Sequence, residues 1–512
     1  MEVKNHEKSG QIPPKSADIV EFRRRGGGGT VAEELSKLPR NDYGNSQRLI
    51  HYFGDDIMYV PNVGWHAWTG THWSGDRGEE IAHLHAQEIG FKIKDEVAFL
   101  DAQGPWKDED PKDFDKRIKA HAGWASTSGN SNKIKAMLIE AAVQLVVPLS
   151  ELNQDKMVYN CLNCTLELRP RSQGGIKARP HDRADRITKI ANVNYDITAK
   201  TQVFDGFLES ILPDEDVRLF LMRWFGYSMT ALTGEQCLAF FYGTGSNGKS
   251  TLMDFMSYIN GTYASTLPIN SFKDDDRKSG GQATPDLAVL PSIRYLCPSE
   301  PKKGFKFAED LIKSMTGGEK MMMRNLHQGF QEFYPEFKIT IAGNHKPIIL
   351  GGDEGIWRRI NLVLFNQHIP KHKCDRQLPE KLRAEASGVL NWMIDGLMMW
   401  LESGLEPPAA ITEATDEYRM DSDPVGQFLE ACTEEDDMAE TSATELYQLY
   451  TAWCSIFSSE PMSMRYFGFK LSDKGLNKRK RGSYYYQGLK VVETVESLKQ
   501  NVGEDYGEED NI

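Results

Sequence analysis

The strongest constraint on this chain is a glycine-rich loop that joins an apolar segment to a helix-forming one. The apolar segment Leu238–Tyr242 predicts a buried strand, and residues 243–250 then read Gly-Thr-Gly-Ser-Asn-Gly-Lys-Ser. This sequence matches the pattern G-x-x-x-x-G-K-[ST] in full, and residues 252–256 predict the helix that should follow it. Strand, loop and helix in this order are the context in which such a loop binds phosphate groups.

The loop predicts a site for ATP and Mg²⁺. Its glycines allow backbone N–H groups to point at phosphate oxygens, and the N-terminus of the next helix adds partial positive charge. Lys249 is expected to reach the β- and γ-phosphates, while the Ser250 hydroxyl is expected to hold the metal. The residues expected to contact the nucleotide are Gly243, Thr244, Gly245, Ser246, Asn247, Gly248, Lys249, Ser250 and Thr251.

Composition narrows the class of protein. Hydrophobic residues make up 40% of the 512 residues and charged residues 26%, as in ordinary soluble proteins. No segment approaches the ~20 apolar residues of a membrane span, and no secretory signal pattern opens the chain. We therefore expect no membrane partner and a cytoplasmic location. The net charge of −14 argues against coating duplex DNA by bulk charge, but a local basic channel remains compatible with nucleic acid.

The pattern along the chain predicts several parts. The expected order is a flexible arm (1–45), an α+β domain (46–200), a helical collar (201–236), an ATPase core (237–375), a helical extension (376–420), a basic C-terminal domain (421–495) and an acidic tail (496–512). Strands and helices alternate within the core, which predicts a mostly parallel sheet.

Three features of the N-terminal parts allow two interpretations each. The cluster Arg23–Arg25 would contact DNA phosphates or be a solvated tail, and we favour the tail. Cys161 and Cys164 form a CxxC with no second pair at zinc spacing, so we favour buried thiols over zinc. A tryptophan cluster would stack bases or fill the core of a small sheet. The cluster consists of Trp65, Trp68 and Trp73.

Polar residues follow later strands of the predicted core. The apolar segment 292–300 ends in Glu300, which is expected to hold Mg²⁺ through water or to polarise the attacking water. The strand 337–344 ends in Asn344, which would sense the γ-phosphate or orient that water. Either Arg358 or Arg359 would complete a neighbouring subunit's site as an arginine finger, and the sequence does not decide between them.

These motifs carry a resemblance to a known family. Together with Thr316-Gly317-Gly318, Ala342–Pro347 and Trp357-Arg358-Arg359, they resemble the superfamily 3 helicase domain of the phage, plasmid and poxvirus replicative primase-helicases. The match runs from about residue 236 to 366. It implies an α/β fold whose P-loop AAA+-like helicase core has a parallel sheet, with a mixed α+β domain before it and a winged-helix-like domain after it.

The resemblance also implies an activity. Members of this family assemble as hexameric rings around single-stranded DNA, bind ATP between subunits and translocate 3′ to 5′, so single-stranded and forked DNA are the expected partners. A hairpin expected over residues 320–334 would enter the channel, with His327 near its tip and Lys320 and Arg324 flanking it. The tip lacks the lysine expected there.

The end of the chain adds a second candidate DNA contact. A predicted hairpin near 477–492 carries a basic run that would touch phosphates or be only a solvated charge run, and both interpretations stay open. The run is Lys478, Arg479, Lys480 and Arg481. No primase pattern is evident, so a separate primase is an expected partner. Two alternatives to a helicase are an origin-binding initiator that melts or loads DNA, and a DNA-sensing ATPase of a defence or packaging system.

Overall fold

The structure is a computed structural model of the chain, and it describes residues 30–273, 285–323, 331–349, 354–456 and 461–497. Arg23–Arg25, Arg324, His327 and the acidic end of the chain lie outside these residues. The chain divides into two compact units, one of residues 1–168 with 175–191 and the other of residues 169–174 with 192–512. None of the described helices is long and apolar enough to cross a membrane.

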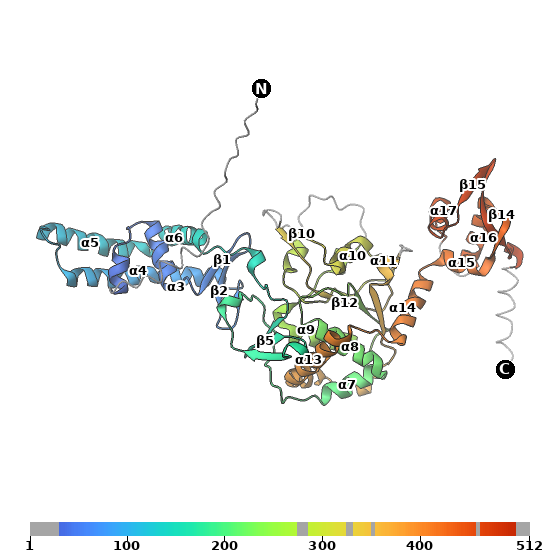
Figure 1. The fold of residues 1–512 in the computed structure, drawn as a ribbon, viewed down its shortest axis with the longest axis horizontal. Coiled ribbons are helices and arrows are strands. Elements are labelled where there is room, and N and C mark those ends of the chain that lie inside the picture. The colour runs from blue at the N-terminus through green and yellow to red at the C-terminus, as the bar shows by residue number, and fades with distance from the viewer. Residues whose placement is uncertain (1–29, 274–284, 324–330, 350–353, 457–460, 498–512) are drawn as a thin grey trace, which may run out of the picture. The chain divides into compact units, whose positions relative to one another are not determined.

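The first unit contains a helical bundle (Figure 1). Its helices are α2 (Val31–Ser36), α3 (Asp42–Phe53), α4 (Gly78–Gln103), α5 (Pro111–Ser128) and α6 (Ser131–Gln144). Apolar side chains from α3, α4 and α6, such as Leu49, Ile89 and Met137, form one buried cluster. Burial of these faces, rather than helix propensity alone, holds such helices in place.

A buried ionic network crosses this bundle. Arg48 donates through Nε to Glu96 Oε1 at 2.7 Å and through Nη2 to Glu96 Oε2 at 2.8 Å, and His121 Nε2 lies 2.9 Å from Glu96 Oε2. The exposed fractions of Arg48, Glu96 and His121 are 0%, 0% and 3%. Arg48 Nη2 also donates to the Leu35 carbonyl at 3.0 Å, so the network ties α2 to α3 and α4.

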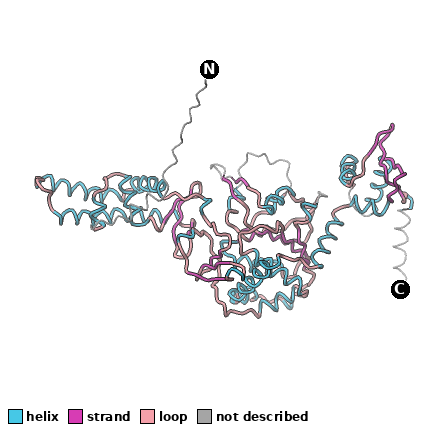
Figure 2. The backbone as a smooth tube through the Cα atoms, in the orientation of Figure 1, coloured by secondary structure: helices cyan, strands magenta, loops and turns pink. Residues whose placement is uncertain are grey.

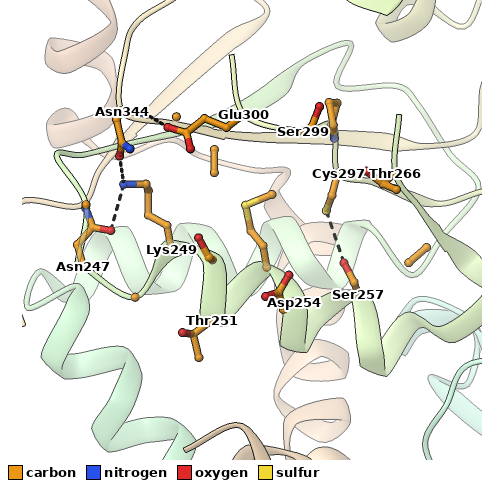
Figure 3. A pocket seen from close by; sticks show the side chains of 18 of the residues that line it. Asn247, Lys249, Thr251, Asp254, Ser257, Thr266, Cys297, Ser299, Glu300 and Asn344 are labelled. Carbon is orange, nitrogen blue, oxygen red and sulfur yellow. Dashed lines mark hydrogen bonds between the residues drawn. The ribbon is translucent and has the colours of Figure 1, made fainter. Parts of the chain in front are cut away.

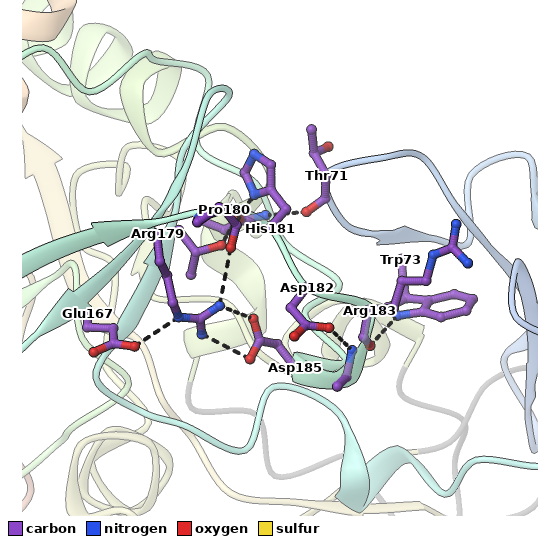
Figure 4. Close-up of polar contacts among 12 residues, drawn as sticks. Thr71, Trp73, Glu167, Arg179, Pro180, His181, Asp182, Arg183 and Asp185 are labelled. Atoms are coloured by element: carbon purple, nitrogen blue, oxygen red, sulfur yellow. Dashed lines mark hydrogen bonds and ion pairs between the residues drawn. The ribbon is translucent and has the colours of Figure 1, made fainter.

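Two small antiparallel sheets complete the first unit. One contains β1 (Ile57–Val60), β2 (Gly64–Trp68) and β3 (Trp73–Ser74), and the other contains β4 (Val158–Asn160), β5 (Thr165–Leu168) and β6 (Ile176–Arg179). Figure 4 shows Arg179 between Glu167 and Asp185, with N–O distances of 2.7 to 2.9 Å. The Trp73 indole N–H donates to the Arg183 carbonyl at 3.0 Å, which joins the first sheet to the segment after β6.

Several N-terminal predictions can be compared with this unit. Trp65 and Trp73 are 5% and 6% exposed, as expected for core aromatic rings, whereas Trp68 is only partly buried. Cys161 and Cys164 are buried thiols. The boundary predicted at residue 46 falls inside α3, and α2 lies within the part predicted to be a flexible arm. Helix α5 was not predicted, although Asp110 caps it and Pro111 occupies its first turn, which are start signals for a helix.

The second unit is built on a five-stranded parallel sheet of order β13-β7-β12-β9-β8 (Figure 1). Its strands are β7 (Leu238–Tyr242), β8 (Ala264–Ser265), β9 (Tyr295–Leu296), β12 (Lys338–Gly343) and β13 (Ile360–Leu364). Every strand pair in it is parallel, so the predicted mixed α/β fold with a parallel sheet is confirmed. Parallel pairing brings the ends of β7, β9 and β12 to one edge of the sheet.

Helices pack against this sheet, as the cyan segments around the magenta strands in Figure 2 show. They are α7 (Val203–Ile211), α8 (Glu215–Tyr227), α9 (Lys249–Asn260), α10 (Glu309–Gly317), α11 (Glu354–Trp357), α12 (Leu378–Ala384), α13 (Ala386–Ser403) and α14 (Ala409–Asp421). Helices α8 and α13 pack so closely that a Cβ at Gly396 would lie 1.9 Å from the Met222 carbonyl oxygen. Trp224 on α8 donates to Thr340 Oγ1 on β12 at 2.9 Å, which fixes α8 against the sheet.

The C-terminal part of the second unit has its own core, in which Phe428, Tyr450 and Phe467 are buried together. Its elements are α15 (Pro424–Cys432), β14 (Thr433–Ser442), α16 (Ala443–Ile456), α17 (Met464–Asp473), β15 (Lys478–Arg481) and β16 (Ser483–Val491). The strands form an antiparallel sheet of order β14-β16-β15. Two helices and the basic hairpin were predicted here, whereas α15 and the acidic strand β14 were not.

Candidate nucleotide site

The loop between β7 and α9 has no room for side chains at two of its glycines. Gly248 has a φ of 82°, and a Cβ there would lie 2.5 Å from Ile211 Cγ2 on α7. A Cβ at Gly243 would lie 2.4 Å from the Phe365 carbonyl oxygen beyond β13. Only glycine accepts both the left-handed backbone and this close approach. The loop is therefore held between α7 and the segment that follows β13.

A cavity of about 790 Å³ opens at the edge of the sheet where β7, β9 and β12 end (Figure 3). The loop and the start of α9 contribute Gly245 to Thr251 to its lining, and the later strands contribute Glu300 and Asn344. Gly243 takes part through its carbonyl oxygen, which accepts a hydrogen bond from Lys249. The residues predicted from separate motifs therefore meet in one place.

Lys249 occupies the centre of this arrangement. Its Nζ donates to the Gly243 carbonyl at 2.7 Å, to Asn247 Oδ1 at 3.0 Å and to Asn344 Oδ1 at 3.3 Å. Lys249 is 5% exposed, and burial lowers its pKa, while the negative charge of Glu300 opposes that shift. All three acceptors are neutral. The ammonium group is therefore largely removed from water without a bonded anion to compensate the loss of hydration. Such a cation is suited to receive a phosphate.

Glu300 and Asn344 are linked directly to each other. The backbone N–H of Asn344 donates to Glu300 Oε1 at 2.8 Å, and both side chains are exposed to the cavity (Figure 3). Asn344 follows β12 immediately, whereas Glu300 lies four residues after β9. The hydrogen bond leaves Glu300 Oε2 and the Asn344 side chain directed at the same space as Lys249.

Hard oxygen donors for a divalent cation are present in the same cavity. The Ser250 hydroxyl and the Glu300 carboxylate both line it, and Mg²⁺ prefers one or two such protein oxygens together with phosphate oxygens and water. Among the described residues, no group of three or more His, Cys, Asp or Glu side chains could hold a metal alone. These donors fit a metal that arrives with a nucleotide.

The two candidate arginines differ sharply in their surroundings. Arg359 is 8% exposed, and it donates through Nε to Thr316 Oγ1 at 3.1 Å and through Nη1 to the Gly355 carbonyl. Arg358 is exposed, and within the described part of the chain its guanidinium has no hydrogen-bond or ion-pair partner. Arg359 therefore fixes α10 against α11 inside its own subunit, while Arg358 is free to contact another molecule.

The structure describes two paired strands in the segment where the channel hairpin is predicted. β10 (Met321–Met323) pairs antiparallel with β11 (Gln331–Phe333), and Lys320 beside them forms an exposed ion pair with Glu332 at 2.8 Å. Arg324 and His327 fall between these strands, outside the described residues. Lys320 thus lies directly before β10, and its contact with DNA stays a prediction.

The basic run at the other candidate DNA contact forms β15. All four side chains, from Lys478 to Arg481, are exposed on this strand. Arg481 Nη1 lies 3.2 Å from Glu440 Oε1 of β14, while Lys478 and Lys480 lie over the Tyr484 ring. The run therefore has one internal ion pair and three cations directed at solvent or at an aromatic ring.

Sequence reasoning missed part of the cavity. Asp254 and Ser257 on α9 and Thr266 after β8 also line it (Figure 3). Asp254 lies four residues after Ser250, so helical spacing places both on one face of α9. That spacing was a usable signal, whereas the position of Thr266 depends on the order of strands in the sheet.

Two known protein families match parts of this chain. Residues 46–213 match the family described as "D5 N terminal like", and residues 420–501 match the family described as "Poxvirus D5 protein-like". Among curated relatives, "Putative helicase L207/L206" of Acanthamoeba polyphaga mimivirus is 28% identical over 48% of this chain and 28% of its own length. "Putative helicase 022R" of Frog virus 3 is 24% identical over 49% and 27%, respectively.

A third relative carries a different description. "Putative primase C962R" of African swine fever virus (strain Badajoz 1971 Vero-adapted) is 22% identical over 60% of this chain and 34% of its own length. The chain thus spans about a quarter to a third of the length of these relatives. Among solved structures, the C-terminal region of NrS-1 matches at 12% identity with a TM-score of 0.35, covering 58% of this chain and 79% of that one.

Proposed function

We propose that this chain is an ATP-driven replicative DNA helicase of the viral primase-helicase group that its motifs resemble, and the matches of residues 46–213 and 420–501 to the two D5-type families support this proposal. The observation that carries this proposal is Lys249, a buried ammonium group with three neutral acceptors at the mouth of a glycine loop. A triphosphate supplies the negative charge that this group lacks. We assign the core to the P-loop AAA+-like class on this basis.

In the proposed reaction, Lys249 exchanges its neutral acceptors for the β- and γ-phosphate oxygens of ATP. Glu300 accepts a proton from, or orients, the water that attacks the γ-phosphate, and the Asn344 amide positions that water. Mg²⁺ bound by Ser250, and by Glu300 through water, would neutralise charge on the phosphate oxygens. The Asn344 N–H bond to Glu300 holds the carboxylate in place for this task.

Arg358 is the proposed arginine finger. It would reach the site of an adjacent subunit, where it would stabilise charge on the transferring phosphoryl group. Arg359 is excluded from that role in our proposal because its guanidinium is committed to Thr316 and Gly355. A finger supplied by a neighbour requires a homo-oligomer, and we propose the hexameric ring that the motifs imply.

DNA would be held in two places. The hairpin β10–β11, with Lys320 at its base and Arg324 and His327 between its strands, would track one strand through the ring in the 3′ to 5′ direction. The C-terminal part, which we propose to be a winged-helix-like domain, would contact phosphates through Lys478, Arg479, Lys480 and Arg481. The relative named as a putative primase supports a role in DNA replication, and we propose that a separate enzyme supplies priming.

Strand displacement tests this function directly. Forked DNA with only a 3′ or only a 5′ single-stranded tail is incubated with ATP and Mg²⁺ and with wild-type, Lys249→Ala or Lys371→Ala protein. Lys371 is an exposed lysine outside the cavity lining and serves as the matched control. Unwinding only with the 3′ tail, lost in Lys249→Ala and kept in Lys371→Ala, is expected. Hydrolysis without unwinding on either tail would reject the helicase.

The exposed basic strand β15 favours one alternative, an origin-binding initiator that melts or loads DNA. An initiator would protect a specific duplex sequence in a footprinting experiment, whereas a helicase protects tails of any sequence. A DNA-sensing ATPase of a defence or packaging system would need a further partner before acting on DNA. Unwinding by the purified chain alone would exclude that class.

A further inference from the structure

Positive charge is concentrated in one segment of the C-terminal part, residues 464–490, although the net charge of the chain is −14. Residues 464–490 contain eight Lys or Arg residues and one Asp. In contrast, strand β14 has five acidic and no basic residues. The two outer strands of this sheet are therefore oppositely charged, and only the edge formed by β15 suits a polyanion.

Exposed aromatic rings lie among these cations. Tyr484 is 48% exposed, and Lys478 Nζ and Lys480 Nζ lie 5.0 Å and 5.9 Å from its ring centroid. Phe469 on α17 is 58% exposed, and its ring stacks on Tyr466 with centroids 6.2 Å apart and an interplanar angle of 22°. Exposed aromatic rings and flexible cations therefore occur together in this part of the chain.

Helix α17 packs against the hairpin β15–β16. A Cβ at Gly468 would lie 3.5 Å from Lys478 Nζ and 3.4 Å from the Tyr486 hydroxyl, so the helix packs directly on the start of β15. Lys478 consequently lies against α17 on one side and over Tyr484 on the other. We call Phe469, Lys478, Lys480 and Tyr484 the aromatic–basic surface.

The chemistry of this surface separates two kinds of DNA. Duplex DNA offers phosphates to cations, but its bases are stacked on each other and give nothing to an aromatic ring. Single-stranded DNA offers both phosphates and the faces of unpaired bases. We propose that the aromatic–basic surface binds single-stranded DNA, with bases stacked on Tyr484 and Phe469 and phosphates on the cations of β15. This inference rests on the proposed function, because it names the form of DNA that this domain holds.

Binding without nucleotide tests the surface. Anisotropy of the full chain is measured with a labelled thymidine 30-mer, a duplex of equal length and an abasic strand of equal length. The double substitution Phe469→Leu and Tyr484→Leu is expected to weaken thymidine binding about tenfold and to leave duplex and abasic binding within about twofold. Lys478→Gln with Lys480→Gln is the matched pair, and it should weaken all three and flatten their salt dependence. Thermal unfolding confirms that each variant folds.

A site-specific measurement separates this surface from any other DNA contact. Photocrosslinking of a 5-iodouracil strand, followed by peptide mass spectrometry, is expected to modify Tyr484 or Phe469. The proposal would be overturned if the aromatic variant bound the thymidine strand as tightly as wild type, or if it lost duplex binding as much as thymidine binding. Crosslinks found only at residues other than Tyr484 and Phe469 would also overturn it. So would loss of self-association in the lysine variant without loss of DNA binding, since that would assign β15 to the acidic β14 of a second copy. None of these measurements needs ATP, so they fail independently of the strand-displacement test.

Discussion

Charged side chains are handled in opposite ways in the helical bundle and in the nucleotide cavity. In the bundle, the Arg48 guanidinium, the Glu96 carboxylate and the His121 ring meet at 2.7 to 2.9 Å and are almost fully buried. In the cavity, Lys249 is nearly as buried but bonds only to neutral oxygens. The charged groups of the bundle bond to one another within the chain, so this cluster has a structural role. The ammonium group in the cavity has no bonded anion among the described residues, and we propose that a ligand supplies it.

The same contrast separates two neighbours in the sequence. Arg359 is buried with Thr316 and Gly355, while Arg358 is exposed without a partner among the described residues. Completeness of partners, rather than residue type, thus distinguishes structural from functional charge here. Removal of a charge that has its partners within the chain should therefore lower only stability, and removal of a charge without such partners should lower only activity.

The largest effect is expected at Arg358. Arg358→Ala should lower ATP turnover by about 10³–10⁵-fold, the usual contribution of an arginine finger, with thermal unfolding unchanged. Phosphate release at steady state measures it. If Arg358 acts on a neighbour, then mixing Arg358→Ala with Lys249→Ala protein should restore part of the activity, because mixed rings contain some complete sites.

Arg359→Ala is the matched control for that substitution. It should lower stability by about 1–3 kcal/mol, because its truncation leaves buried acceptors unsatisfied. If Arg359→Ala were stable but inactive and Arg358→Ala fully active, then the assignment of the two arginines would be reversed.

The next effect is expected in the bundle. Arg48→Met should destabilise the first unit by about 3–5 kcal/mol, since it leaves the Glu96 carboxylate buried without its main partner. Hydrogen exchange of α3 and α4 in urea measures this, and turnover per folded molecule should stay at the wild-type value. Adding Glu96→Leu should recover most of the loss. If Arg48→Met and the double variant Arg48→Met with Glu96→Leu were equally unstable, lost packing rather than an unpaired buried charge would explain the effect.

A smaller effect is expected at Asn344. Asn344→Ala removes the side-chain amide, which positions water in our proposal and also accepts a hydrogen bond from Lys249, but it keeps the backbone N–H that holds Glu300. We expect kcat to fall by about 10²–10³-fold, with little change in nucleotide affinity or stability. His345→Ala, at the next exposed position, is the control. A change in affinity alone would contradict the role assigned to the amide.

The smallest effect is a pH dependence of the bundle. Burial raises the pKa of Glu96, but hydrogen bonds and charges from Arg48 and His121 lower it more, so the net pKa is below the ordinary value of 4.5. A carboxylate with a lowered folded-state pKa stabilises the fold above its unfolded pKa and loses this contribution as the pH falls through the folded value. Unfolding followed from about pH 6 to about pH 3 should therefore show a weaker slope in Glu96→Gln. Equal slopes would show that Glu96 does not titrate with folding.

The sequence predicted the elements whose chemistry is local. The loop between β7 and α9 is recognisable because glycine, lysine and serine must stand at fixed spacing to bind phosphate. Glu300 and Asn344 were each predicted as a polar residue at the end of an apolar strand, and they lie together in the structure because parallel strands end at one edge. The roles of Arg358 and Arg359 were not predictable, since burial of one of two adjacent arginines depends on Thr316, which lies more than forty residues away.

Two missed elements had different causes. Helix α5 begins with a capping aspartate and a proline, so the start signal of this helix is present in the sequence. Strand β14 reads Thr-Glu-Glu-Asp-Asp-Met-Ala-Glu-Thr-Ser, which has no apolar alternation. It forms as an edge strand because β16 offers it hydrogen-bonding partners, and no local propensity indicates that.

The contact between Gly248 and α7 has a mechanical consequence. Ile211 already occupies the position that a Cβ at Gly248 would take, so the loop cannot tilt toward α7 without pushing it. Close-packed groups transmit such a displacement rather than absorb it. If phosphate binding shifts the glycine loop toward α7, we therefore expect α7 to be displaced as a whole helix.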